Sequence, residues 1–256
     1  MSTSADPVIL TPLGGPTVLV EVGGVRFLAD PTFDVAGEYP IGSRVLVKTT
    51  DAVWTPEQVG QVDAVLLSHD QHPDNLDHGG RAYLASESPL TLTTPVAAEH
   101  LGGTAAGLRP WEARQVGDVT VTAVPAQHGP DGTEHLTGPV TGFVLAAPGG
   151  PHLYVSGDNA SLRLVAEVAD RFGHIDLAVL FAGAARTPLV DGYLTLTSEE
   201  AVEAARILGT PPVLPVHTDG WEHFTQDGAS LRAAFSAAGL DSLLLPVTLG
   251  QAISLA

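Results

Sequence analysis

Short apolar runs bounded by Gly, Pro or polar residues alternate along this chain with longer segments whose apolar positions repeat with a helical period. Two β-type runs, 17–22 and 25–29, are separated only by Gly23 and Gly24, which predicts a β-hairpin. Further runs of this kind predict strands at 62–67, 119–124, 141–146, 153–156, 177–181, 213–216 and 242–245. The helical period predicts helices at 79–86, 95–101, 160–172, 198–208 and 229–238.

The predicted helix at 198–208 begins with a specific local signal. Thr197 can serve as its N-cap and Glu200 as its third helical residue, which together make a capping box, and Gly209 follows its last residue. Strands dominate the first part of the chain, and strands and helices alternate afterwards. This order is typical of two packed sheets covered by helices. We therefore expect an α/β fold, an αββα sandwich of two mixed sheets with helices on the outer faces.

Length and composition favour one domain. The chain has 256 residues, of which 44% are hydrophobic, and no long low-complexity linker interrupts it. Sandwiches with covering helices reach this length as one unit, so we expect a single domain over residues 1–256. The chain has no cysteine. Disulfides, thiolate ligands and thiol nucleophiles are thereby excluded, and His, Asp and Glu remain for metal chemistry.

The charge balance excludes some partners. Eleven Lys and Arg residues stand against 29 Asp and Glu, a formal net charge of −18, and no basic cluster is visible. Such a surface repels a phosphate backbone, so we expect a small-molecule substrate and no nucleic acid. The N-terminus has no signal-peptide pattern, and no run approaches the roughly 20 apolar residues of a membrane helix. We expect a cytoplasmic protein with no membrane partner, and a homo-oligomeric state stays open.

The densest group of metal-type side chains follows the apolar run 62–67. Within the segment 68–77 lie two imidazoles and three carboxylates, those of His69, His72, Asp70, Asp74 and Asp77. Neutral imidazole nitrogen and carboxylate oxygen are the ligands that bind zinc and similar divalent ions. For a His-x-x-His pair alone, however, a solvated polar loop that caps helices is the better interpretation.

Three isolated residues favour a metal site over a solvated loop, namely His128, Asp158 and His217. They come at the ends of the β-type runs 119–124, 152–156 and 213–216. Strand ends next to Gly or Pro are places where a fold can gather side chains that are distant in sequence. Taken singly, either histidine can be satisfied in the core, and Asp158 can cap the helix that starts near Ala160. The coincidence of four such sites favours a shared metal centre.

These elements, in this order, resemble the metallo-β-lactamase superfamily, and within it the branch of metal-dependent hydrolases related to ascorbate-phosphate lactonases. The resemblance covers most of the chain. It begins with the segment 24–31, which ends in Asp30 and Pro31, and continues through the His/Asp segment, His128, Ser156-Gly157-Asp158 and His217. The order of five dispersed elements is far more specific than any one of them. It implies the metallo-β-lactamase fold.

The His/Asp segment departs from the usual family motif, His-x-His-x-Asp-His, in two places. Two residues separate His69 from His72. Either His69 reaches the metal by way of a bulge, or Asp70 takes the first ligand position. Asn75 replaces the last histidine, and an amide oxygen is a weaker ligand for a transition ion than an imidazole. A single ion, or a weakly bound second ion, is therefore an alternative to two ions.

The resemblance implies one or two divalent ions, with zinc preferred and manganese or iron as alternatives. We expect the first ion to be held by His69, His72 and His128, and the second by Asp74, Asp158 and His217. By the same resemblance Asp158 bridges the two ions, and Asp74 orients the attacking water and accepts its proton. These roles predict a metal-dependent hydrolase in which a metal-activated water attacks a small-molecule ester, lactone, amide or phosphoester. The alternatives are a phosphodiesterase or nuclease of the same superfamily and a non-catalytic metal-binding protein.

Outer positions of the site have weaker signals. Asp30 can brace a ligand through a hydrogen bond, or it can be an ordinary turn residue before Pro31. We expect His135, Trp221 and His223 to line the substrate pocket, although Trp221 can equally be an ordinary buried aromatic. The segment 33–53 is expected to be a loop over the mouth of the site and contains Tyr39, Arg44 and Lys48.

Overall fold

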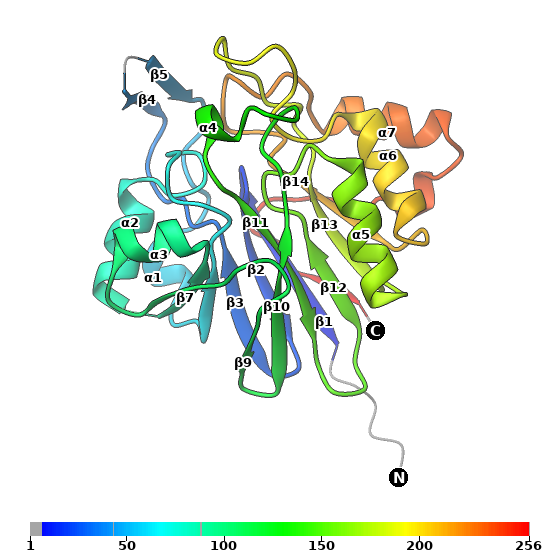
Figure 1. Ribbon diagram of the computed structural model, residues 1–256, viewed down its shortest axis with the longest axis horizontal. Coiled ribbons are helices and arrows are strands. Elements are labelled where there is room, and N and C mark those ends of the chain that lie inside the picture. Colours follow the sequence, from blue (N-terminus) through cyan, green and yellow to red (C-terminus); the bar gives the residue numbers. More distant parts are fainter. Residues whose placement is uncertain (1–6, 43, 88, 256) are drawn as a thin grey trace.

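The computed structural model describes residues 7–42, 44–87 and 89–255. Two mixed sheets lie face to face in the centre of the molecule, and helices cover the outer face of each (Figure 1). The αββα sandwich expected from the sequence is thereby confirmed.

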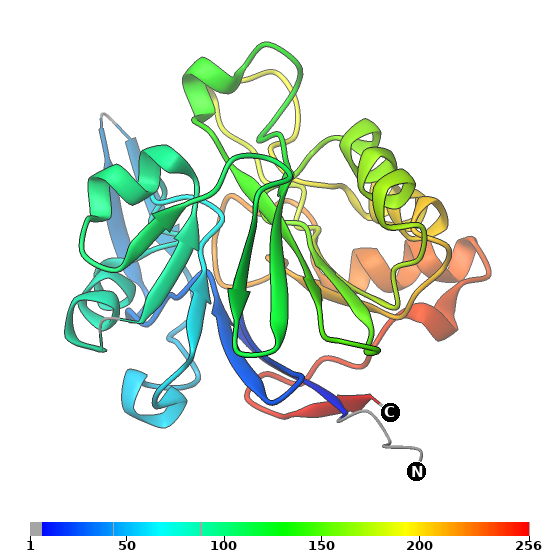
Figure 2. The same ribbon diagram turned by 60° about the horizontal axis from the view of Figure 1, so that its bottom comes forward.

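The first sheet has seven strands, and its two halves differ in direction. Their spatial order is β15 (Ile253–Leu255), β1 (Val8–Gly14), β2 (Thr17–Val22), β3 (Val25–Ala29), β6 (Ala64–Leu66), β7 (Leu90–Thr93) and β8 (Ala105–Gly107). The strands from β15 to β3 pair antiparallel, whereas those from β3 to β8 pair parallel. Figure 2 shows β15 beside β1, so the C-terminal strand closes the edge formed by the first one.

The second sheet has six strands and is also mixed. Their spatial order is β14 (Val213–Val216), β13 (Leu177–Phe181), β12 (His152–Val155), β11 (Thr141–Ala146), β10 (Val119–Pro125) and β9 (Ala113–Val116). Strands β12, β13 and β14 are parallel, and the others pair antiparallel. Since β10 and β12 both run antiparallel to β11, strands β10, β12 and β14 all end at the same edge of the sheet.

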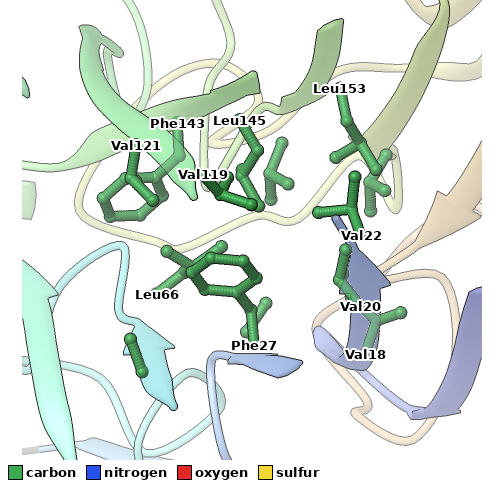
Figure 3. Packing of buried hydrophobic residues seen from close by; sticks show 14 of the residues in the cluster. Val18, Val20, Val22, Phe27, Leu66, Val119, Val121, Phe143, Leu145 and Leu153 are labelled. Atoms are coloured by element: carbon green, nitrogen blue, oxygen red, sulfur yellow. The ribbon is translucent and has the colours of Figure 1, made fainter. Parts of the chain in front are cut away.

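The core between the sheets consists of the inward side chains of both (Figure 3). Val18, Val20 and Phe27 of the first sheet face Phe143 and Leu145 of the second, and each is at most 1% exposed. Burial of an apolar side chain of this size contributes about 1.5 to 3 kcal/mol. The strands are therefore held firmly, and so are the loops that continue from their ends.

Each outer face is covered by its own helices. The outer faces are covered by α1 (Pro56–Val59), α2 (His78–Glu87), α3 (Pro95–Leu101), α5 (Leu162–Phe172), α6 (Ser198–Ile207) and α7 (Gly228–Ala237), whereas the short α4 (Glu134–Thr137) lies in the loop between β10 and β11. Val59 of α1 and Tyr83 of α2 pack on the first sheet. Val165 of α5, Val202 of α6 and Leu231 of α7 pack on the second. Within the described part of the chain, every helix falls short of the length and apolar character that a membrane crossing requires.

The segment expected to be a loop over the site is a two-stranded hairpin, formed by β4 (Gly37–Ile41) and β5 (Arg44–Lys48). It projects from the sandwich at the upper left of Figure 1. A buried ion pair anchors its base, because the Nζ atom of Lys48 lies 3.1 Å from Oδ2 of Asp77. The backbone nitrogen of Thr49 also donates to the carbonyl oxygen of Gly220, at 2.8 Å.

Most predicted elements are confirmed, and several keep their bounds, including both strands of the first hairpin. The capping box of α6 is present, with Thr197 accepting from the backbone of Glu200. The strand predicted at 242–245 is wrong. Residues Asp241–Leu243 form a 3-10 helix, and Leu244 makes only an isolated bridge to Val213. Pro246 follows directly and has no N–H to continue a ladder.

Candidate metal centre

The candidate side chains meet because each follows the C-terminal end of a strand. His69, His72 and Asp74 come after β6, His128 after β10, Asp158 after β12 and His217 after β14. The ligand atoms form two groups, and within each group they lie within 4.8 Å of one another. The first group is His69, His72 and His128, and the second is Asp74, Asp158 and His217. Both groups have the membership that the sequence predicted for two ion sites.

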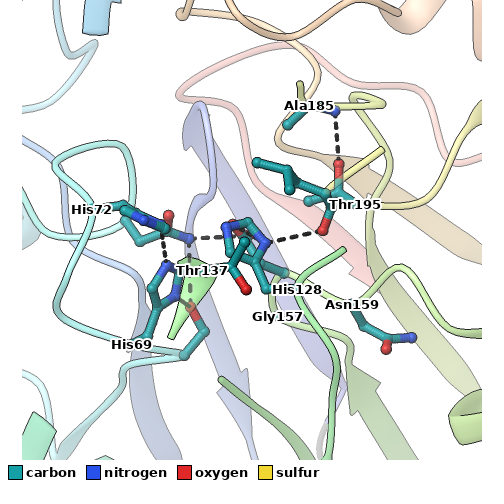
Figure 4. Close-up of polar contacts among 12 residues, drawn as sticks. His69, His72, His128, Thr137, Gly157, Asn159, Ala185 and Thr195 are labelled. Atoms are coloured by element: carbon teal, nitrogen blue, oxygen red, sulfur yellow. Dashed lines mark hydrogen bonds and ion pairs between the residues drawn. The ribbon is translucent and has the colours of Figure 1, made fainter. Parts of the chain in front are cut away.

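The three imidazoles of the first group face a common space (Figure 4). Nε2 of His69 lies 2.9 Å from Nδ1 of His72. The ring centroid of His128 lies 5.3 Å from that of His69 and 5.1 Å from that of His72. Two nitrogens bound to one tetrahedral zinc, each at about 2.0 to 2.1 Å, are about 3.3 Å apart. The spacing of His69 and His72 is close to this value.

Hydrogen bonds to neighbouring groups orient His69 and His128. The Ser68 hydroxyl donates to Oδ2 of Asp30 at 2.7 Å, so it accepts from Nδ1 of His69 at 2.9 Å. Nδ1 of His128 donates to the carbonyl oxygen of Leu194 at 3.0 Å. Each contact places the proton on Nδ1 and leaves the Nε2 lone pair turned toward the group. Metal-binding histidines are held by their second nitrogen in this way.

The second group is bound together by close contacts between imidazole and carboxylate. Nε2 of His217 lies 3.3 Å from Oδ2 of Asp74 and 3.5 Å from Oδ1 of Asp158. Nε2 of His223 lies 3.1 Å from the same Oδ2 of Asp74. The sequence predicts His223 in the pocket wall but does not predict this contact. No motif marks His223, because its position depends on the loop after β14.

Asn75 stands where the family motif has its last histidine, but its amide works as a donor. Nδ2 donates to Oδ2 of Asp30 at 3.0 Å and to Oδ1 of Asp158 at 3.1 Å. Asn75 therefore joins two carboxylates of the centre and adds no imidazole to it. Asp30 in turn accepts from the backbone nitrogen of Ser68 at 2.6 Å. Asp30 thus braces two neighbouring residues, Ser68 and Asn75, and through them His69 and Asp158.

Burial decides the ionisation of the imidazoles. It lowers the pKa of His128 to about 3 and the pKa of His69 well below its ordinary value, with further lowering from the neighbouring imidazoles. Burial likewise lowers the pKa values of His72 and His217. These rings are neutral near pH 7. Neutral rings have the lone pairs that metal coordination requires.

The two carboxylates of the second group are perturbed in opposite directions. Burial alone would raise the pKa of Asp74, but contacts with His223 and His217 lower it well below its ordinary value. Burial, followed by the charges of Asp74 and Asp30, raises the pKa of Asp158 well above its ordinary value. Two buried carboxylates this close resist being charged together, and a bound cation removes that resistance.

Unsatisfied polar atoms converge on the same place. Nε2 of His128, Oδ1 of Asp74 and Oδ2 of Asp158 are buried and have no hydrogen-bond partner among the described residues. Buried polar atoms are nearly always paired, so such a concentration indicates a group that takes all of them as ligands. Nitrogen and oxygen donors without sulfur suit zinc, manganese or iron. The residues present therefore fit one or two divalent ions.

Backbone geometry next to two of the ligands requires glycine. Gly157, directly before Asp158, has φ +56°, and a Cβ there would lie 2.4 Å from the carbonyl oxygen of Thr141. A Cβ on Gly183 would lie 1.9 Å from the carbonyl oxygen of His217. His217 itself has φ 58°, which is uncommon for a residue other than glycine. Backbone strain of this kind is typical of functional sites.

The other carboxylates of the His/Asp segment point away from the centre. Asp70 pairs with Arg81 at 3.6 Å and with His100 at 3.4 Å. Of the two candidates for the first ligand position, His69 lies with His72 and His128, whereas Asp70 does not. Asp77 accepts hydrogen bonds from the backbone nitrogens of Phe33 and Asp34, and it forms the ion pair with Lys48 of the hairpin.

The expected pocket residues are divided. A cavity beside the centre is lined by His223, with Ile41, Arg44, Leu46, His72, Asp74, His128, Arg186, Thr187 and Leu194. Trp221 is 3% exposed and packs against Tyr39 of the hairpin, outside this lining. His135 is exposed and its Nδ1 contacts the carbonyl oxygen of Gly132. Of the three expected residues, His223 alone lines the cavity.

Comparison with known proteins agrees with this geometry. The sequence matches the β-lactamase superfamily domain over residues 25–218. The chain belongs to the β-lactamase superfamily. The matched residues include both groups of the centre, and the superfamily expected from the sequence is confirmed. The narrower relation to ascorbate-phosphate lactonases stays a prediction.

Individual proteins of similar sequence or structure agree with this assignment to the superfamily. A metal-dependent hydrolase of Methanosphaerula palustris is 30% identical over 182 residues, which cover 67% of this chain and 75% of that protein. An isothiocyanate hydrolase from Delia radicum gut bacteria has a similar structure, with a TM-score of 0.83, 21% identity and coverage of 96% and 98% of the two chains. A metallo-β-lactamase fold protein of Bacillus subtilis has a TM-score of 0.65, 16% identity and coverage of 97% and 99%. The two structures show the fold, and the sequence relative supports the expected class of metal-dependent hydrolase.

Proposed function

We propose that this protein is a metal-dependent hydrolase that directs water at an ester, lactone, amide or phosphoester bond of a small molecule. The observation that supports this most is the convergence of six imidazole and carboxylate side chains, all but that of His72 buried, at one edge of the sandwich, where polar atoms of Asp74, His128 and Asp158 are unsatisfied. A structural ion site needs no access to solvent. Here a cavity opens beside the centre and is lined by His72, Asp74 and His128.

His69, His72 and His128 would hold the first ion, and Asp74, Asp158 and His217 the second, with zinc preferred. Asp158 lies between the two groups, since its Oδ2 is 3.5 Å from Nδ1 of His128 and its Oδ1 is 3.5 Å from Nε2 of His217, and by the family resemblance it would be shared by the two ions. A divalent ion, when bound, lowers the pKa of a coordinated water to about 7 and polarises a carbonyl or phosphoryl oxygen.

The protein's own groups would orient the water and receive its proton. Asp74 is ionised at neutral pH because the imidazoles of His217 and His223 lower its pKa. A carboxylate with an unsatisfied Oδ1 can accept a hydrogen bond from water at the centre. Its Oδ2 accepts a hydrogen bond from Nε2 of His223 at 3.1 Å, which holds the carboxylate in place at the cavity wall.

The acidic surface supports a small-molecule substrate over nucleic acid. The formal net charge is −18, and a phosphate backbone approaching such a surface is repelled. The hairpin and the loop after β13 both line the cavity, through Ile41 and Leu46 on one side and Thr187 on the other. A compact substrate suits an entrance between two such elements.

The test measures bound metal and substrate hydrolysis on the same protein preparation. Protein purified without added metal is analysed for bound elements and then assayed on a panel of neutral and charged esters, lactones, amides and phosphoesters, before and after chelation. We expect bound zinc, manganese or iron, and turnover that chelation abolishes and metal restores. The variant His69→Ala/His128→Ala should lose both. A protein that binds metal but leaves the whole panel intact, or that turns over unchanged after complete chelation, would contradict the proposal.

A further inference from the structure

Arg44 is unusual among the arginines of this acidic chain. In the described ranges only Arg26 and Arg44 are partly withdrawn from bulk solvent, and the remaining arginines are exposed. Arg26 pairs with Glu21, with Nε 3.2 Å from Oε1. Arg44 has no carboxylate partner within the described residues, although the chain contains 29 Asp and Glu. Because none of the described carboxylates neutralises it, the guanidinium of Arg44 is available to an incoming anion.

Arg44 lies beside the candidate metal centre. Arg44 begins β5 and lines the cavity beside the metal centre together with His72 and Asp74. Its Nη1 donates to the hydroxyl oxygen of Thr187 at 2.6 Å, across the entrance. Because Arg44 and the ligands His72 and His128 line the same cavity, a molecule bound there can touch both Arg44 and the first ion group.

Arg186 places a second guanidinium at the same cavity. It lies over the ring of Tyr193, with 5.2 Å from Cζ to the ring centroid, and its Nη2 is 3.9 Å from the exposed carboxylate of Asp191. Two of the chain's eleven basic residues thus border one small cavity. Positive charge placed at an entrance, on an otherwise acidic surface, selects for anions.

We infer that the substrate of this site carries a negatively charged group, a carboxylate or a phosphate, beside the bond to be cleaved, and that Arg44 binds this group. The inference rests on the proposed function and names the substrate class. One guanidinium edge can hold two oxygens of such a group, whereas a hydroxyl takes a single N–H. An arriving anion would therefore replace Thr187 as the partner of Arg44.

The size of the cavity agrees with this exchange. The cavity has a volume of about 30 Å³, because the hairpin and the loop containing Thr187 meet over it. A volume of that size holds about one water, so a substrate must separate the two elements as it enters. The contact between Arg44 and Thr187 is the hydrogen bond that has to open. A charged oxygen compensates for its loss, and a neutral group does not.

The experiment measures anion binding without turnover. Titration calorimetry on zinc-loaded protein compares butyrate with its neutral isostere butyramide, and ethyl phosphate serves as the phosphate arm. We expect at least one anion to bind about 10-fold or more tightly than butyramide. Arg44→Ala should remove that preference while zinc content stays unchanged, and Arg44→Lys should restore part of it. The stronger of the two anions identifies the charged group.

Two further variants separate anion binding from a structural role. Arg114→Ala removes the same charge from an exposed position on β9 and should leave the preference intact. Thr187→Val removes the present partner of Arg44 and should keep or strengthen anion binding. Equal binding of all three probes, an unchanged preference in Arg44→Ala, or the same loss in Thr187→Val would overturn the inference. Zinc content and hydrolysis are measured separately, so failure of the proposed function is distinguishable from failure at Arg44.

Discussion

The side-chain amide of Asn75 donates a hydrogen bond to Oδ1 of Asp158, with the two atoms 3.1 Å apart. The same nitrogen donates to Asp30 at 3.0 Å. The residue that replaces a histidine of the family motif thus steadies one carboxylate of the centre and links it to a second. The second ion group keeps one imidazole, that of His217, beside two carboxylates.

This arrangement predicts two ion positions of unequal affinity. The group of three neutral imidazoles should fill first in a stepwise zinc titration, and the group with Asp74 and Asp158 should fill at higher zinc concentration, because a histidine of the motif is missing there. Asn75→His should tighten the second step. Asn75→Ala, which removes the donor without adding a ligand, is the matched control and should weaken it. Two equally tight ions in the native protein would contradict this prediction.

Metal binding should depend on residues far from the His/Asp segment. His128→Ala and His217→Ala each remove one ligand from a different group, and each should lower the bound metal by about one ion or more while the fold persists. Elemental analysis with circular dichroism measures both quantities. His135→Ala, which removes an exposed histidine from the same half of the chain, should keep full metal content. Full retention in both ligand variants would refute the dispersed site.

Asp74 should matter more for turnover than for shape. Asp74→Asn keeps the size of the side chain and removes the charge that contacts His217 and His223, so kcat should fall by about 10² or more if general-base help is of ordinary size. Asp70→Asn is the control from the same segment, because Asp70 pairs with Arg81 outside the centre. Steady-state kinetics on the best substrate of the panel decides the matter, and near-native kcat in Asp74→Asn would rule out the assignment.

Asp30 should make the stability of the metal-free protein depend on pH. Burial is the main cause that raises its pKa from 3.8 to about 7. A raised pKa means that the protonated form is favoured on folding, so the contribution of Asp30 is full below about pH 4 and is lost as pH rises through about 7. A shift of this size corresponds to on the order of 4 kcal/mol.

Urea unfolding between pH 4 and pH 8 measures this contribution. In the native sequence the free energy of unfolding should contain a part that falls across this range, and Asp30→Asn should lack it. The variant also loses hydrogen bonds to Ser68 at every pH, so the slope and not the level is compared. Parallel slopes for the two proteins would show that Asp30 is already ionised in the folded state.

Local patterns predicted those helices and strands whose own residues show a clear hydrophobic pattern. Strands β2, β3, β11, β13 and β14 and helix α3 have the predicted bounds because each is a short segment with Gly, Pro or a polar residue within two positions of its end. The seven-residue strand β1, which contains Pro12, was not predicted, and neither were the short strands β7, β8 and β9 and the edge strand β15. The last four are only three or four residues long and exist through pairing with distant strands, which leaves little signal in their own sequence.

Residue types and local apolar runs are enough to predict the kinds of ligand, their order along the chain and the strand ends that carry them. Which of these residues share a site depends on the three-dimensional fold. Asp70, Asp74 and Asp77 stand in one segment, yet only Asp74 faces the metal centre, since the turn after β6 directs the other two toward Arg81 and Lys48. The approach of Arg44 to Thr187, 143 residues later, likewise exists only after the hairpin is anchored. Such contacts are set by the packing of distant elements, and no local pattern records them.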